Sequence, residues 1–242
     1  WLMWACSDDD DPQTAAPVAT QPTGTAVTPA TPAPQARLRA LHLSPDAPAV
    51  DIFANAGAAP VVQGLAFLQG TDYLEIDPGS YDLAVTPTGA GLAAAVLNID
   101  GLNLSANIQA TAVAFDEVAN IQALALIDDA ANLAAGNIRV RAVHTASGVD
   151  QVDIWNLPAG AAPTPVVEDL DFAVSSDKLD LPAGAYTLGI DVDDDANPDL
   201  IYDLPDLPAG TVANVFAVAD NADVFLVAQL QDGTVARVDA RP

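Results

Sequence analysis

The residues best suited to chemistry in this chain stand at matching places in two similar segments. The only two histidines, His42 and His144, lie 102 positions apart. The same spacing separates Arg39 from Arg141. A histidine can act as a catalytic base or a metal ligand, and an arginine can bind a carboxylate. A repeat of this kind indicates that the chain contains one domain written twice. The repeat also relates Asp51 to Asp153.

Each histidine ends an apolar stripe on a predicted strand. Because side chains alternate between the two faces of a strand, Leu38, Ala40 and His42 share one face and the arginines point to the other. A zinc site needs further His or Cys ligands, which neither segment has. We therefore expect the histidines to be half-buried and hydrogen-bonded to a carboxylate such as Asp51 or Asp153. We expect the arginines to pair with Asp on a neighbouring strand, with binding of a carboxylate ligand as the alternative.

A second candidate site is an acidic run in the second half of the chain. Oxygen-bearing side chains occur there at alternate positions, as they do in a calcium-binding loop. The run departs from that loop because Ala196 stands where glycine is usual and Tyr202 stands where a bidentate Glu is usual. Calcium is therefore a candidate cofactor, and a solvated acidic surface is the alternative. The candidate ligands are Asp191, Asp193, Asp195, Asn197 and Asp199.

The charge of the chain limits its partners. The formal net charge is -26, with 33 acidic residues against 7 basic ones. Such a field repels nucleic acid and anionic lipid, so we expect neither as a partner of the folded part. The sequence also has no G-x-S-x-G motif and no Cys–His pair in a readable context. We expect a protein that is not an enzyme; a hydrolase of an unrecognised type is the alternative.

The first residues indicate the cellular location of the protein. Residues 1–6 (WLMWAC) are typical of the end of an apolar signal stretch. Ala5-Cys6-Ser7 resembles the processing site of bacterial lipoproteins, in which the cysteine is lipidated, although Met3 stands where Leu is usual. A stray cysteine in a disordered tail is the alternative. Residues 7–35 are rich in Pro, Thr and Ala and contain no Lys or Arg, which predicts a disordered tether.

From Ala36 onward the pattern is that of an all-β protein. Short apolar runs are interrupted by Pro, Gly, Asn and Asp about every 8 to 12 residues. We predict two tandem immunoglobulin-like β-sandwich domains, at 36–134 and 135–242. The stretches 91–96 and 121–132 have helical propensity, but their counterparts in the second half favour strands, so we predict strands. A last strand has no counterpart and is expected to pair with an edge of the second domain. The predicted strands are 37–43, 49–55, 71–76, 80–86, 93–99, 108–115 and 119–127, then 138–145, 151–157, 175–181, 185–191, 200–203, 212–219, 223–230 and 234–240.

One segment resembles a known family. Residues 42–51 (HLSPDAPAVD) resemble the hallmark of the domain-of-unknown-function family 4397, and 64–67 and 81–87 are similar to its usual run. The second copy keeps His144 but lacks the Ser-Pro-Asp-Ala-Pro turn. The resemblance implies secreted or surface-attached β-sandwich domains, often in tandem, and no known reaction. The hallmark residues, which we expect to be structural, are Arg39, His42, Ser44, Pro45, Asp46, Pro48, Asp51, Arg141, His144 and Asp153.

These observations predict an extracytoplasmic protein, lipid-anchored to the cell envelope or cell surface, with a role in adhesion or surface structure. Membrane contact is expected only through the lipid, and an envelope protein or glycan is the expected partner. The alternative is a carbohydrate- or peptide-binding surface module, which calcium could control. A pocket lined by Trp155, Tyr186 and Asp residues would favour ligand binding. A free edge strand would favour self-association.

The address can be tested at Cys6. Expressed in bacteria behind a complete signal peptide, the protein should partition into detergent because a lipid is attached to this sulfur. The Cys6→Ser variant should be released into the soluble fraction, as judged by immunoblotting. Retention of Cys6→Ser in the membrane fraction would contradict the lipoprotein prediction.

Overall fold

A computed structural model describes residues 33–129, 131–221 and 223–242. The predicted lipidation site Cys6 and the predicted tether up to residue 32 lie outside these described residues. Residues 34–242 form one compact unit. Within the described part of the chain, no helix has the length and apolar character needed to cross a membrane.

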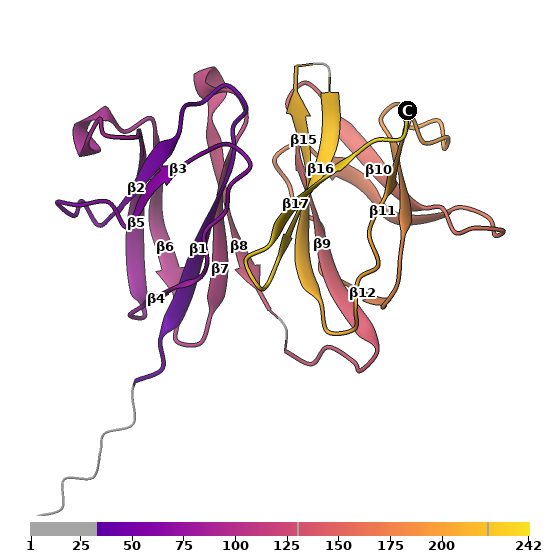
Figure 1. Cartoon of the computed structure of the whole chain (residues 1–242), viewed down its shortest axis with the longest axis horizontal. Helices are drawn as coiled ribbons and strands as arrows, with labels where there is room; N and C mark the ends of the chain where they lie inside the picture. Colours follow the sequence, from indigo (N-terminus) through magenta and orange to yellow (C-terminus); the bar gives the residue numbers. More distant parts are fainter. Residues whose placement is uncertain (1–32, 130, 222) are drawn as a thin grey trace, which may run out of the picture. The chain divides into compact units, whose positions relative to one another are not determined.

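The described residues form β-strands joined by loops and short 3-10 turns (Figure 1). The first half contains β1 (Ala36–Leu43), β2 (Val50–Ala54), β3 (Val62–Leu65), β4 (Leu74–Ile76), β5 (Gly79–Pro87), η1 (Leu92–Ala94), β6 (Leu97–Leu104), β7 (Gln109–Phe115), η2 (Val118–Asn120) and β8 (Gln122–Asp128). The second half contains β9 (Asn137–Thr145), β10 (Gln151–Asn156), β11 (Thr164–Asp171), β12 (Leu179–Pro182), β13 (Thr187–Asp191), β14 (Leu200–Asp203), β15 (Val212–Asp220), β16 (Asp223–Leu230) and β17 (Val235–Asp239).

Each half is a sandwich of two sheets, and the strand order is the same apart from the additional strand β17 in the second half. The first half has the sheets β4-β1-β7-β8 and β3-β2-β5-β6, and the second has β12-β9-β15-β16-β17 and β11-β10-β13-β14. In each half, the first strand runs parallel to a later one, β1 to β7 and β9 to β15. The predicted tandem β-sandwich architecture is therefore confirmed. Its strand order differs from the constant-type immunoglobulin order, in which the first two strands share a sheet, because β1 and β2 lie in opposite sheets.

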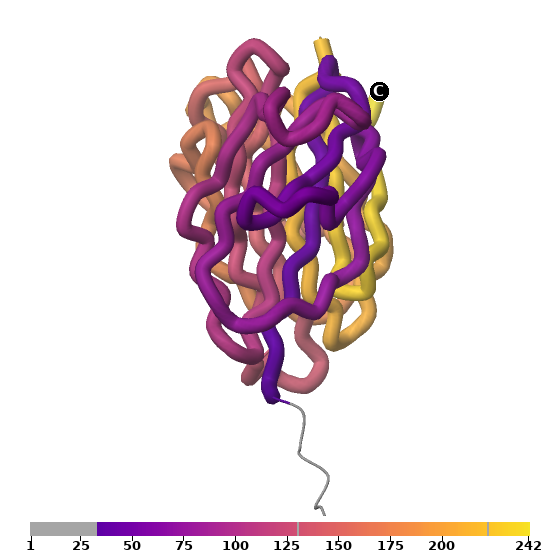
Figure 2. Tube along the Cα trace, turned by 90° about the vertical axis from the view of Figure 1, so that its left-hand side faces the viewer, coloured from indigo at the N-terminus to yellow at the C-terminus, as the bar shows by residue number. Residues whose placement is uncertain are grey.

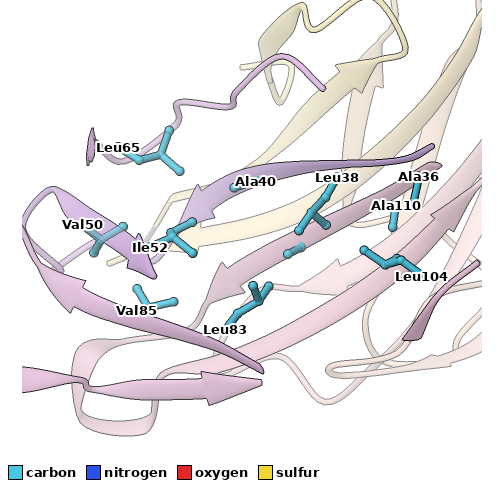
Figure 3. Packing of buried hydrophobic residues seen from close by; sticks show 11 residues of the cluster. Ala36, Leu38, Ala40, Val50, Ile52, Leu65, Leu83, Val85, Leu104 and Ala110 are labelled. Carbon is cyan, nitrogen blue, oxygen red and sulfur yellow. The ribbon is translucent and has the colours of Figure 1, made fainter. Parts of the chain in front are cut away.

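The core of the first sandwich follows from the two-residue period of its strands. Leu38 and Ala40 of β1 point toward the opposite sheet, which contributes Ile52, Leu83 and Val85 (Figure 3). All five are buried. The Cα trace in Figure 2 shows the strands of this sandwich, in indigo to magenta, running up and down in alternation.

Most predicted strands are present, and the differences have local causes. The sequence missed β3 and β11, because Gly64 and Pro165 interrupt runs that are otherwise short or acidic. The predicted strand 93–99 begins only at Leu97, because the preceding Ala-rich residues form η1. The segment 121–132 contains the predicted strand, β8. The last strand, β17, pairs with β16 as expected.

In sheet β4-β1-β7-β8, the central strands β1 and β7 are buried on both faces. The second face of this sheet packs against residues of β9, β15 and β16, and this packing forms a hydrophobic cluster drawn from both sandwiches. Phe115 and Phe172 meet edge to face in this cluster, with ring centroids 5.9 Å apart. The buried members of the cluster are Leu41, Leu43, Val113, Phe115, Leu126, Val143, Phe216, Val218, Phe225 and Val227.

The repeated arginines cross this interface in a reciprocal way. Arg39 Nη1 donates a hydrogen bond to the carbonyl oxygen of Leu230, and Arg141 Nη2 donates to the carbonyl oxygen of Ile127 at 2.8 Å. Ile127 and Leu230 hold equivalent places in β8 and β16, as the strand registers show. The two halves therefore meet as the subunits of a two-fold symmetric dimer do.

A buried ion pair stands at the centre of the interface. Arg39 Nη2 lies 3.5 Å from Asp128 Oδ2, and both side chains are almost fully buried. Asp128 also accepts hydrogen bonds from the hydroxyl groups of Thr111 and Tyr73 and, across the interface, from the amide of Asn214 at 2.8 Å. Burial, together with Asp128, raises the pKa of Tyr73, so its hydroxyl remains a donor. The Tyr73 ring also lies 4.6 Å from the Arg39 guanidinium carbon.

Because of this network, Asp128 should contribute far more to the stability of the fold than Glu75, which is the exposed partner of another β1 arginine, Arg37. Removing one member of a buried pair leaves an uncompensated charge, so Asp128→Ala should lower the free energy of unfolding by about 3–5 kcal/mol. The matched control is Glu75→Ala, which breaks the exposed pair between Arg37 and Glu75 and should cost less than about 1 kcal/mol. Urea unfolding measures both. The Arg39→Met/Asp128→Leu double variant should regain part of the loss. Equal costs for the two single variants would contradict the assigned role.

Candidate functional site

His42 is sealed inside the first sandwich by backbone contacts. The residue is fully buried. Its Nδ1 accepts a hydrogen bond from the backbone N–H of Ser44 at 3.3 Å, and its Nε2 lies 3.2 Å from the carbonyl oxygen of Pro48. Because Nδ1 is an acceptor, the proton is on Nε2, which donates to Pro48. Burial lowers the pKa of His42, which fits a neutral ring.

His144 repeats this arrangement in the second sandwich. Its Nδ1 accepts from the backbone N–H of Ala146 at 3.4 Å, and its Nε2 lies 3.0 Å from the carbonyl oxygen of Asp150. Burial again lowers the pKa of the ring, which meets Phe172 edge to face. The expectation of a half-buried histidine bonded to Asp51 or Asp153 is wrong in two respects: each ring is fully buried, and each bonds a backbone carbonyl of the turn that follows its strand.

The Ser-Pro-Asp-Ala-Pro turn closes over His42. Pro45 and Asp46 form the turn, and Asp46 Oδ1 accepts a hydrogen bond from the backbone N–H of Val118 at 2.8 Å. The turn thus joins the end of β1 to the segment after β7. The Ser44 hydroxyl is buried and has no hydrogen-bond partner in the described residues.

Asp51 and Asp153 occupy equivalent positions at which the strand pairing of their sheets is irregular. Asp51 accepts hydrogen bonds from the backbone N–H groups of Gly64 and Gly89, both at 2.9 Å. These donors lower the pKa of Asp51, with Gly89 the larger contributor. Asp153 accepts from the backbone N–H of Asp169 at 2.7 Å. Gly64 and Asp169 both have left-handed backbone, with φ of 65° and 56°, and the strand register shifts beside each aspartate. Each carboxylate therefore fixes a β-bulge.

Of the four arginines, one meets the prediction of an Asp on a neighbouring strand, namely Arg139 with Asp180. Arg37 pairs with Glu75 and Arg139 with Asp180, each directly opposite in register on an adjacent strand. Arg39 pairs with Asp128, two strands away in its sheet. Arg141 departs from the prediction, because its hydrogen bond goes to the backbone carbonyl of Ile127. Burial lowers the pKa of Arg141.

The acidic run gathers carboxylates at the end of β13. Asp191, Asp193 and Asp195 each place an oxygen within 4.8 Å of the others. Asp191 is 1% exposed, and its Oδ1 accepts backbone N–H bonds from residues 193 and 194. Its buried Oδ2 has no hydrogen-bond partner in the described residues. Asp195 first, and then burial and the neighbouring carboxylates of Asp199 and Asp191, raise the pKa of Asp193.

The remaining predicted ligands shape the loop. Asp199 Oδ2 accepts a hydrogen bond from the backbone N–H of Val192 at 2.9 Å, and Asn197 donates its backbone N–H to Asp195 at 2.8 Å. Ala196 has φ of 62°. The place where calcium loops use glycine therefore takes the left-handed conformation here with an alanine, at some cost in strain.

Sequence reasoning missed one neighbour of this loop. Asp153 lies directly opposite Asp191 in the register of β10 and β13, where opposed Cβ atoms are about 4.5–5.5 Å apart. Like charges in this position repel. The equivalent pair in the first sandwich is Asp51 and Thr86, so the acidic site belongs to the second sandwich. The repeat relates Asp51 to Asp153, but no sequence pattern indicates that Asp153 and Asp191 lie opposite each other.

The fold and these contacts define a tandem β-sandwich protein whose repeated polar residues brace turns and an internal interface. Residues 36–155 match the family described as Domain of unknown function (DUF4397). This region belongs to the family, and it covers the first sandwich and the opening strands of the second. That the second sandwich is a further copy stays a prediction.

Two solved structures resemble the chain slightly. One is described as alpha-glucan binding by a streptococcal virulence factor; it is 14% identical, with 74% of this chain and 91% of that chain covered, at a TM-score of 0.25. The other is a protein of Bacteroides ovatus ATCC 8483 proposed to act in cell adhesion; it is 8% identical, with 86% and 98% covered, at a TM-score of 0.23. Similarity this low carries no argument about function. No curated protein matches the chain.

The sealed histidines should make stability depend on pH. Because burial lowers the pKa of both rings from the ordinary value of 6.5, the unfolded chain binds more protons than the folded one below that pH. The free energy of unfolding should therefore fall as the pH drops below about 6.5, by at most about 1.4 kcal/mol per pH unit for each histidine. At neutral pH, His42→Ala or His144→Ala should each cost about 1–3 kcal/mol.

Urea unfolding between pH 5 and 8 tests this dependence. The His42→Gln/His144→Gln variant corrects for the titration of other groups, because its difference from the wild-type chain should shrink as the pH falls. A difference that stays constant over this range would show that the histidines do not carry the effect.

Proposed function

We propose that this chain is a non-enzymatic protein of the cell envelope, held at the surface by a lipid on Cys6, that acts in adhesion or surface structure. Two features support this role. His42, His144 and Arg141 bond backbone carbonyls, and Arg39 forms a buried ion pair, so these residues act as structural braces. The family resemblance implies secreted or surface-attached domains, and the Ala5-Cys6-Ser7 site predicts an address of the same kind.

The observation that carries a binding function is the acidic loop after β13. A buried carboxylate oxygen without a hydrogen bond is costly, and Asp191 Oδ2 is such an oxygen. Asp193 and Asp195 add oxygens beside it, and their mutual repulsion raises the pKa of Asp193. A divalent cation would satisfy the buried oxygen and cancel this repulsion. We assign calcium to this place because its flexible coordination suits a loop of hard oxygen ligands.

Calcium would then order the loop that borders one end of the second sandwich. Adhesive surface proteins commonly act through loops that a rigid scaffold positions. The alternative function is binding of a glycan or peptide in a calcium-dependent way by the same loop. A glycan array probed in calcium and in EGTA distinguishes the two, because a calcium-dependent glycan signal favours the alternative.

Calcium should raise the melting temperature of the protein in a specific way. A cation that binds the folded state stabilises it by mass action, and a loop without the Glu of calcium loops should bind in the range of about 10⁻⁴–10⁻³ M. Thermal melts in millimolar calcium should therefore show a rise that magnesium, and sodium at matched ionic strength, do not give. Calcium should bind more weakly as the pH falls, because protons compete for Asp193.

Two variants control this experiment. Asp193→Ala/Asp195→Ala should abolish the calcium-specific rise. Asp100→Ala/Glu117→Ala removes the same charge from exposed places in the first sandwich and should keep the rise. Equal rises in all three salts, or an equal loss in both variants, would leave only a screened acidic surface.

A further inference from the structure

A large apolar cavity lies between the two sheets of the second sandwich. Its volume is about 350 Å³. Leu, Ile and Val residues from both sheets supply most of its wall, among them Ile154, Leu188, Val215 and Leu226. From the sequence, a pocket lined by Trp155, Tyr186 and Asp residues would favour ligand binding. Tyr186 does line this cavity, whereas Trp155 and Asp residues are absent from its described lining.

In the first sandwich, side chains fill the corresponding space between the two sheets. The equivalent cavity there has a volume of about 20 Å³. Ile52 and Leu83 are buried, whereas their counterparts Ile154 and Leu188 are only partly buried. These two pairs are identical in type, so their different burial reflects looser packing around them in the second sandwich.

An apolar cavity of this size is costly unless something occupies it, because its walls lose packing contacts. Water gains little there, since it needs two or more polar partners. Pockets of about 300–1,000 Å³ are typical of small-molecule sites. Thr164 and Pro165 of β11 are exposed and also line the cavity, so an edge strand offers a way in.

The charge and polarity of the site restrict the occupant further. Polar groups at the wall include the neutral side chains of Asn156 and Thr164. Arg141 also lines the cavity, but its guanidinium Nη2 donates across the interface to Ile127. The net charge of -26 opposes an anionic head group. An uncharged hydrocarbon chain with a neutral polar end fits these conditions, whereas a sugar does not.

We propose that the second sandwich binds one uncharged hydrocarbon chain, such as the alkyl chain of a long-chain alcohol, between its sheets. This activity is independent of the calcium loop and of the lipid on Cys6. The first sandwich has no room for such a ligand and serves as an internal reference.

The proposal is tested with the full chain and the neutral fluorescent probe N-phenyl-1-naphthylamine. The probe should bind with one site per chain, and 1-dodecanol should displace it. Dodecanol should also raise the melting temperature. Laurate at pH 8 should compete at least about ten-fold more weakly, because its carboxylate meets the acidic field. Absence of probe binding together with an unchanged melting temperature would overturn the proposal.

Two matched substitutions locate the site. Ala217 lines the large cavity and Ala114 lines the small one, at equivalent places in β15 and β7. Ala217→Leu should weaken probe binding at least about ten-fold while the melting temperature stays equal or rises. Ala114→Leu should lower the melting temperature, because that core is filled, and leave probe binding unchanged. Loss of probe binding in Ala114→Leu but not in Ala217→Leu would overturn the assignment. If Ala217→Leu does not fold, the dodecanol-dependent rise in melting temperature of the wild-type chain decides.

Discussion

The structure depends on satisfying one buried guanidinium group. Arg39 is 2% exposed in the middle of a sheet that is covered on both faces. Its charge can be there only because Asp128 neutralises it and because Thr111 and the Leu230 carbonyl accept its hydrogen bonds. Since Leu230 belongs to the second half of the chain, this requirement ties the two sandwiches together. The apolar cluster packs residues of both sandwiches together, and the hydrogen bonds of the network to Leu230 and Asn214 fix the register in which the sheets meet.

Each of the repeated polar residues supplies a hydrogen-bond partner to backbone groups that would otherwise lack one. The histidines satisfy a carbonyl and an N–H in the turn after the first strand of each sandwich. Asp51 and Asp153 satisfy amides at a bulge, where the ladder of the sheet is interrupted. Such groups would be costly if buried alone. The residues that stand out in the sequence are therefore those that permit irregular backbone in two small cores.

The sequence predicted the all-β tandem, most strands and the alternation of β1, but it did not predict the second buried face. The signal was present, because Leu41 and Leu43 follow Arg39 on the same face of β1. A strand that is apolar on both faces is covered on both. Strand β11 was missed because Pro165 and acidic residues interrupt the apolar pattern that would indicate a strand. The acidic loop was found from spacing, whereas the unpaired oxygen of Asp191 and the opposition of Asp153 depend on packing that no local pattern records.

The reciprocal arginine contacts make the chain resemble a dimer whose subunits became joined. In a dimer of identical subunits, every substitution occurs twice and each half must tolerate it. A covalent tandem escapes this restriction, so its halves can diverge in sequence while the contact between them persists. The first half keeps the Ser-Pro-Asp-Ala-Pro turn and a filled core, and the second has an acidic loop and an open interior. The stability of one half can thus allow the other half to lose core packing and to gain new binding surfaces.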